Sequence, residues 1–118
     1  MNETQKMAVF FAALYLGLVF LMIPLILKKI KPNKIYGLRI KETLGDEEVW
    51  YSANTWSGRL GMNIAIFLGM VSLVSGFFVN LAVDQFAMVN LALMLVVLGI
   101  WAVMSISYAK GLSKQKQH

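Results

Sequence analysis

Residues 7–27 read MAVFFAALYLGLVFLMIPLIL, a run without a single charged side chain. Two further uncharged runs follow, LGMNIAIFLGMVSLVSGFFVNLAV at residues 60–83 and QFAMVNLALMLVVLGIWAVMSISYA at residues 85–109. Crossing the hydrocarbon core of a bilayer takes about 20 helical residues, and each run is long enough. Strands buried in a soluble protein would be shorter and separated by turn residues. We therefore predict an all-α membrane protein with three transmembrane helices.

Charged and turn-forming residues set the approximate limits of the spans. We expect spans at about residues 7–29, 60–83 and 86–109, within a single domain that covers residues 1–118. Pro24 predicts a kink near the end of the first span, and Pro32 disfavours helical geometry at the residue before it. The first helix is therefore expected to end near Lys29. A cleaved signal peptide is the alternative for this run, but its apolar stretch is longer than the usual 7–15 residues or so.

Residues 30–59 form a polar linker between the first two spans. We expect a loop up to Gly45 and then an interfacial amphipathic helix at about residues 46–58, which runs or bends into the second span. Thr43 and Asp46 are both plausible N-caps for that helix. The aromatic residues Trp50, Tyr51 and Trp56 are of the kind that settles at headgroup depth.

Small residues recur at every fourth position at the start of the second span. They are Ser57, Gly61, Ala65 and Gly69. Small side chains at this spacing let two membrane helices approach closely, so we predict a helix-packing face here. Asn63 lies in the same stretch, and we expect its amide to bond a neighbouring helix.

Basic side chains gather on one side of the predicted spans. The linker and the two residues before it carry Lys28, Lys29, Lys31, Lys34, Arg39, Lys41 and Arg59, and the tail carries Lys110, Lys114 and Lys116. The positive-inside rule then places the linker and the C-terminus in the cytoplasm and the N-terminus outside. Since these charges flank the spans, the net charge of +5 indicates contact with membrane lipid rather than with nucleic acid.

Few residues carry reactive chemistry. The chain has no cysteine, and its one histidine is His118. The acidic residues Glu42, Asp46, Glu47 and Glu48 lie beside abundant lysine, without the histidine or cysteine that would complete a metal-binding set. No charged residue interrupts a span, which argues against a transporter acting alone. We expect no catalytic residue, no metal and no cofactor, and hence no enzyme.

The linker combines residues of unusual conformational and hydrogen-bonding character. The candidate functional residues are Pro32, Asn33, Tyr36, Gly37, Arg39, Thr43, Trp50, Asn54 and Gly58. Pro-Asn favours a turn, and glycine permits backbone conformations closed to other residues. Arg39 presents a rigid fork of five donors, and Trp50 and Asn54 lie one helical turn apart.

This arrangement resembles the SdpI family of bacterial membrane proteins, which carry P-N-x-x-Y-G-x-R, then T, W-x-x-A-N and G in the same order. The resemblance implies an immunity protein of the bacterial cytoplasmic membrane that neutralises a secreted, membrane-active peptide toxin. It also implies a role for the nine candidate residues, among which Arg39, Trp50 and Asn54 are the strongest functional candidates.

Two other functions stay open at this point. One is a signalling or scaffold protein whose basic linker recruits a cytoplasmic repressor. The other is a lipid-headgroup-binding protein or small transporter subunit in which Arg39 holds phosphate. In each case three helices bury little of their own surface, so we expect a homo-oligomer.

Overall fold

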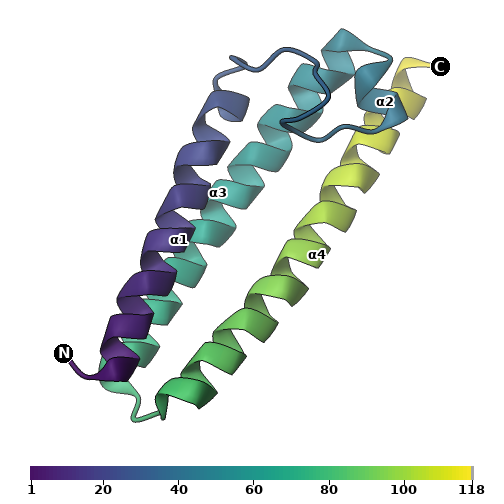
Figure 1. The fold of residues 1–118 in the computed structure, drawn as a ribbon. Helices are drawn as coiled ribbons and strands as arrows, with labels where there is room; N and C mark the ends of the chain where they lie inside the picture. The colour runs from purple at the N-terminus through teal and green to yellow at the C-terminus, as the bar shows by residue number, and fades with distance from the viewer. Residues whose placement is uncertain (118) are drawn as a thin grey trace.

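The protein consists of three long helices and one short helix (Figure 1), seen in a computed structural model that describes residues 1–117. The helices are α1 (Glu3–Ile26), α2 (Lys41–Leu44), α3 (Glu47–Phe78) and α4 (Val83–Lys116). The three long helices are each long and apolar enough to cross a membrane. The all-α membrane fold predicted from the uncharged runs is thus confirmed. His118 lies outside the described residues.

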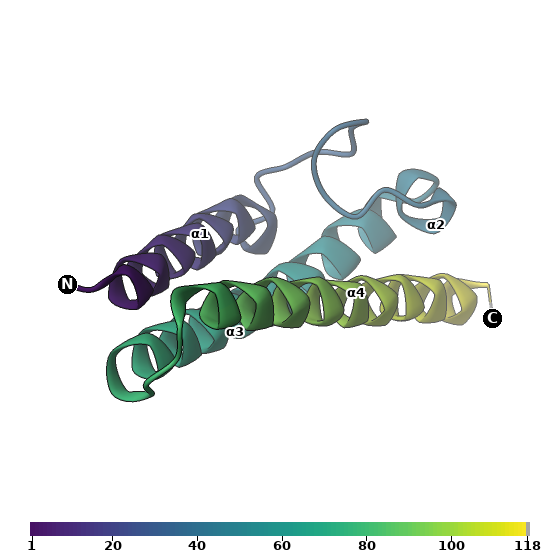
Figure 2. The ribbon, with the colours of Figure 1, turned by 60° about the horizontal axis from the view of Figure 1, so that its bottom comes forward.

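The helices form an elongated bundle in which α3 is the shared element. α1 packs along α3 over much of its length. α4 makes fewer contacts with α3 than α1 does, and fewer still with α1. The N-terminus and the short α3–α4 connection lie at one end, called the hairpin end below (Figure 1). The loop after α1, α2 and the end of α4 lie at the opposite end, called the linker end. Figure 2 shows α4 running alongside α3 toward this end.

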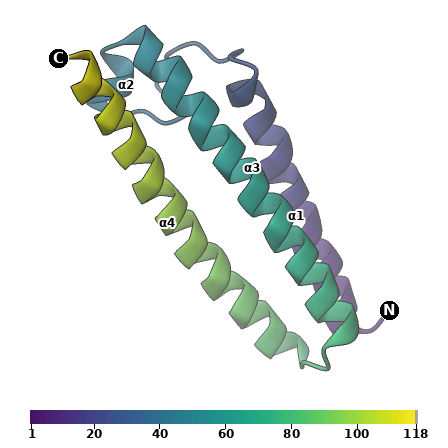
Figure 3. The same ribbon diagram turned by 180° about the vertical axis from the view of Figure 1, so that it is seen from behind.

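Helix α3 is longer than the bilayer requires. Its 32 residues span about 48 Å at 1.5 Å per residue, against a hydrocarbon core of about 30 Å. The segment expected as an interfacial helix, residues 46–58, is not a separate element, because it runs into the second span without a break (Figure 3). The first turns of α3 therefore stand beyond the uncharged run and support the linker.

The core lies between the three long helices toward the hairpin end. It is formed by Ala8, Phe11 and Tyr15 of α1, Ala65 and Leu68 of α3, and Phe86 of α4. Two hydroxyls tie α1 to its neighbours: Ser72 donates to the Ala8 carbonyl at 3.2 Å, and Thr4 donates to the Leu81 carbonyl at 2.9 Å. In a bilayer such interhelical bonds satisfy groups that have no water available.

The first helix ends earlier than the sequence predicts. α1 ends at Ile26, and Lys28 adopts a left-handed conformation with φ of 59°. The backbone N–H of Lys28 donates to the Leu25 carbonyl, and that of Lys29 donates to the Pro24 carbonyl at 2.9 Å. This pair of bonds is a Schellman cap, which satisfies the last carbonyls and turns the chain away from the helix axis.

The linker contains one short helix that the sequence analysis assigned to loop. Helix α2, Lys41–Leu44, comes directly before the start of α3. Asp46 is the N-cap of α3, since its carboxylate accepts bonds from the backbone N–H groups of Glu48 at 3.0 Å and Val49 at 3.3 Å. Of the two predicted N-caps, Asp46 therefore takes this role for the long helix.

Candidate functional site

Two buried side chains hold the linker against the first turns of α3. Trp50 is 0 % exposed, and its indole N–H donates to the Ile30 carbonyl at 2.8 Å. The Asn54 side-chain oxygen accepts the backbone N–H of Leu38 at 2.7 Å, while its NH₂ group donates to the Trp50 carbonyl at 2.9 Å. Trp50 thus faces protein rather than lipid headgroups, contrary to the expectation for an interfacial aromatic.

Thr43 stabilises the linker internally, within α2. Its buried hydroxyl donates to the Leu38 carbonyl at 2.8 Å and lies 3.0 Å from the Ile40 carbonyl. The same oxygen accepts the Ile40 backbone N–H at 3.0 Å. One hydroxyl therefore closes the turn that leads from the loop into α2.

Asn33 organises the tip of the linker. Its side-chain oxygen accepts the backbone N–H groups of Ile35 at 2.8 Å and Tyr36 at 2.7 Å. Its NH₂ group donates to the carbonyls of Lys31 at 2.7 Å and Tyr36 at 3.1 Å. A single amide thus satisfies four backbone groups, the turn-forming behaviour typical of asparagine. Pro32, directly before it, is exposed.

Two other candidate residues reach back to main-chain carbonyls. The Tyr36 hydroxyl donates to the Leu21 carbonyl of α1, and the Arg39 guanidinium donates to the Lys34 carbonyl. Arg39 is otherwise exposed on the linker surface. Partial burial raises the pKa of the Tyr36 phenol above its ordinary value.

Gly37 is required by both conformation and space. Its φ of 108° lies in a region that other residues rarely adopt. A Cβ atom added here would lie 2.9 Å from the Asn54 side-chain oxygen and 3.1 Å from the Trp50 ring. The backbone at Gly37 consequently lies flat against these two side chains.

The small residues of α3 face the other two long helices. Gly58 lies against Leu25 and Ile26 of α1, and Gly61 lies against Met22 of α1 and Trp101 of α4. Along the same face Ser57 and Ala65 are buried, and Gly69 lies near Tyr15.

Two asparagines of the spans, Asn63 and Asn90, lie in different environments. Asn63 does not bond a neighbouring helix: it is exposed on the bundle surface, and among residues 1–117 no hydrogen bond of its side chain is found. Asn90, in contrast, is buried and donates to the Phe86 carbonyl of its own helix at 3.0 Å.

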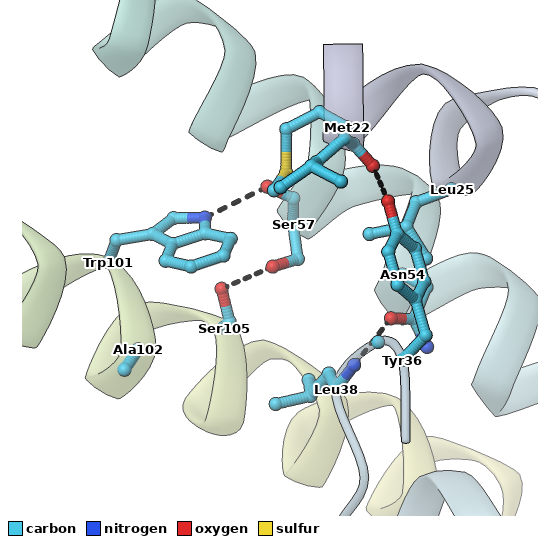
Figure 4. Close-up of a pocket in the computed structure, with 11 residues that line it drawn as sticks. Met22, Leu25, Tyr36, Leu38, Asn54, Ser57, Trp101, Ala102 and Ser105 are labelled. Carbon is cyan, nitrogen blue, oxygen red and sulfur yellow. Dashed lines mark hydrogen bonds between the residues drawn. The ribbon is translucent and has the colours of Figure 1, made fainter. Parts of the chain in front are cut away.

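A cavity of about 230 Å³ lies beneath the linker, and we call it the linker cavity (Figure 4). It is lined by Leu21, Met22 and Leu25 of α1, Tyr36, Gly37 and Leu38 of the linker, Asn54 and Ser57 of α3, and Trp101, Ala102 and Ser105 of α4. Three of these residues, Tyr36, Gly37 and Asn54, are candidate functional residues from the sequence, and Ser57 belongs to the predicted packing face. In this cavity the linker motif meets all three spans.

Most of the lining is apolar, and its polar groups bond one another. The Ser57 and Ser105 hydroxyls are 2.7 Å apart, and the Trp101 indole N–H donates to the Ser57 carbonyl at 2.9 Å (Figure 4). No carboxylate, lysine or arginine lines the cavity. Such a lining suits an apolar side chain. Within residues 1–117 no group of acidic, histidine or cysteine side chains is placed to hold a metal.

The α4 residues of this cavity were not found from the sequence. Trp101 and Ser105 lie one turn apart, and Trp101 is the only tryptophan of the third span. That spacing is a usable signal, but it does not say which neighbouring helix the pair faces.

An ion-pair cluster closes the linker end on its outer surface. The Lys116 ammonium group lies 2.7 Å from Asp46 and 2.9 Å from Glu48. The hydrogen bond from Lys116 lowers the pKa of the Asp46 carboxyl, and the bond to Asp46, followed by that to Glu48, raises the pKa of Lys116. The end of α4 is thereby tied to the start of α3.

Together these features define a multi-pass helical membrane protein whose interhelical linker is folded over a small apolar cavity. The SdpI/YfhL protein family matches residues 29–109, and the chain belongs to that family. The match includes the whole linker motif, α3 and most of α4. Neither curated proteins nor solved structures gave a match to the chain. Family membership supports a membrane protein of the immunity type, in a family not known to be enzymatic.

Proposed function

We propose that this protein protects its host cell by binding a secreted, membrane-active peptide, and that the linker cavity receives an apolar side chain of that peptide. Family membership supports immunity in general, and the observation that carries the finer proposal is the position of the cavity. The matched linker motif forms its roof, and all three spans contribute to its walls.

The size of the cavity favours a side chain over a free small molecule. Pockets for drug-sized ligands measure about 300–1,000 Å³, whereas the linker cavity holds about 230 Å³. A peptide already in the bilayer would present its side chains at this depth. Binding would hold the peptide against one protein molecule and keep it from assembling with other copies.

We further propose that the linker end faces the cytoplasm. Most basic residues of the chain lie in the linker and at the end of α4, while Asp84 is the only charge near the α3–α4 connection. The positive-inside rule supports the N-terminus-outside orientation for this distribution.

Filling the cavity tests the proposal. Ala102→Phe places a ring in the cavity, and Ala92→Phe adds the same ring to an exposed position of the same helix outside it. A sensitive bacterial strain expressing each variant would be challenged with the secreted peptide of an SdpI-type system, with membrane levels matched. We expect Ala102→Phe to lose protection and Ala92→Phe to retain it; full protection by Ala102→Phe would refute the role of the cavity.

One observation favours a second function, the recruitment of a soluble partner. Ile35 at the tip of the linker is 88 % exposed, and it lies beside Lys34. A photo-crosslinker at position 35 that captures a DNA-binding repressor in intact cells would support recruitment. Capture of the peptide alone would support immunity without it.

A further inference from the structure

A second surface cavity, of about 350 Å³, lies at the linker end and shares no residue with the linker cavity. We call it the basic cavity. Its lining includes the basic residues Lys28 and Arg59 and the hydroxyl-bearing residues Ser52 and Thr55. Trp56 and Tyr108 line its remaining side. All of its charged groups carry the same sign.

The two cations are not neutralised by the protein. Neither Lys28 nor Arg59 forms an ion pair with a carboxylate of residues 1–117, where the salt bridges involve Lys6 and Lys116. Both side chains are exposed. The left-handed backbone at Lys28 and the helical backbone at Arg59 set the directions in which these two side chains leave the chain. The cavity is therefore complementary in charge to an anion.

The depth of the cavity identifies the source of that anion. Lys28 is the first charge after the uncharged run 7–27, and Arg59 is the last charge before the run 60–83. Tyr108 lies next to the end of the third run, 85–109. Its ring stacks on that of Trp56, with the ring centroids 4.3 Å apart and an angle of 4° between the ring planes. Three spans and an aromatic pair thus mark one membrane boundary, the level at which phospholipid phosphates lie.

We infer that the basic cavity binds the phosphate of an anionic phospholipid. Arginine pairs with phosphate oxygens through two parallel bonds, lysine adds a point charge, and the Ser52 hydroxyl can donate to a remaining oxygen. The Thr55 hydroxyl donates to the Leu25 carbonyl at 3.4 Å. A lipid is favoured over a free phosphate ion because apolar Ile26 and the Trp56–Tyr108 pair border the same cavity. This assignment differs from the sequence-based alternative, since Arg39 lies outside the basic cavity and donates to Lys34.

The purified full-length protein in neutral detergent would be titrated with phosphatidylglycerol, with bound lipid counted by native mass spectrometry. Lys28→Gln/Arg59→Gln would be compared with Lys31→Gln/Lys114→Gln, which removes the same charge from exposed positions outside the cavity. We expect the first variant to bind about fivefold more weakly for each charge removed, and the second to bind like the unmodified protein. An equal loss in both variants would show general attraction to positive charge and overturn the site.

Two further arms distinguish the ligand. Phosphatidylcholine, which carries phosphate without net charge, is expected to bind more weakly to the unmodified protein and to be little affected by the substitutions. Inorganic phosphate at millimolar concentration is expected not to displace bound phosphatidylglycerol. Displacement by inorganic phosphate would overturn the assignment to a lipid, and equal binding of both lipids would overturn the requirement for an anion.

Discussion

The side-chain oxygen of Asn54 on α3 accepts the backbone N–H of Leu38 in the linker at 2.7 Å, and this bond joins residues 16 positions apart in the chain. Asn54 is 2 % exposed and its NH₂ group bonds the Trp50 carbonyl, so the amide is satisfied on both sides. The candidate residues in this part of the linker therefore build the roof of the linker cavity. Their contribution to binding would be made through the shape of that roof.

Replacing Asn54 by alanine should release the linker from α3. The change leaves the Leu38 N–H without its acceptor, which costs about 1–3 kcal/mol when the group is buried. Trypsin should then cleave the linker at Lys34 or Lys41 faster than in the unmodified protein in detergent. Asn63→Ala is the matched control, since the same change is made on the same helix at an exposed residue. Equal cleavage rates for both variants would contradict the role given to Asn54.

Gly37→Ala should disturb the same region through the backbone. A non-glycine residue in left-handed conformations costs about 1–2 kcal/mol, and here the added methyl also meets Asn54 and Trp50. We expect a lower thermal unfolding temperature and a shifted tryptophan emission. Gly111→Ala, where a Cβ has open space, should leave both unchanged or raise the unfolding temperature slightly. An unfolding temperature that falls in both variants by the same amount would refute the explanation.

The distribution of charge was enough to predict the fold, because a bilayer admits few alternatives for three uncharged runs of this length. It did not predict the end of α1, where the sequence offers no glycine and Lys28 takes the left-handed position instead. Nor could it show that α1 rather than α4 is the main partner of α3. Small residues mark a packing face, but they do not name the helix that packs on it.

The linker turn could be partly predicted, since Asn33 and Gly37 have known conformational preferences. The burial of Trp50 could not be predicted. An aromatic residue at the end of a span has the same sequence pattern whether it faces lipid or lies under a loop. The contributions of Trp101 and Ser105 to the linker cavity could not be predicted either, because local periodicity does not report contacts between distant segments.

Gly76→Ala should separate α1 from α3 near the hairpin end. An added methyl would overlap the Cβ of Ala8, which is bonded to the backbone and cannot rotate away. Overpacking of this kind costs about 1–3 kcal/mol. Gly99→Ala, with nothing near the added atom, is the control. Thermal unfolding in detergent should show a loss for the first variant alone, and unchanged stability of Gly76→Ala would contradict the close contact between these helices.

The Lys116 cluster should open at both extremes of pH and stay closed between them. The lowered pKa of Asp46 means that its stabilising effect is present at neutral pH and is lost as the pH falls through that lowered value. The raised pKa of Lys116 means that its stabilising effect is complete below the ordinary lysine pKa and is lost as the pH rises through the raised pKa.

Because the native chain has no cysteine, spin labels on Leu44→Cys and Ser113→Cys can report the distance from α2 to α4. We expect a constant distance between the labels from about pH 6 to about pH 8, and a longer one outside the range in which Asp46 and Lys116 are both charged. In Lys116→Gln the distance should be longer at every pH. Lys114→Gln is the control and should leave the distance unchanged. If the distance changes within the neutral range, or is the same in Lys116→Gln as in the unmodified protein, another contact holds the end of α4.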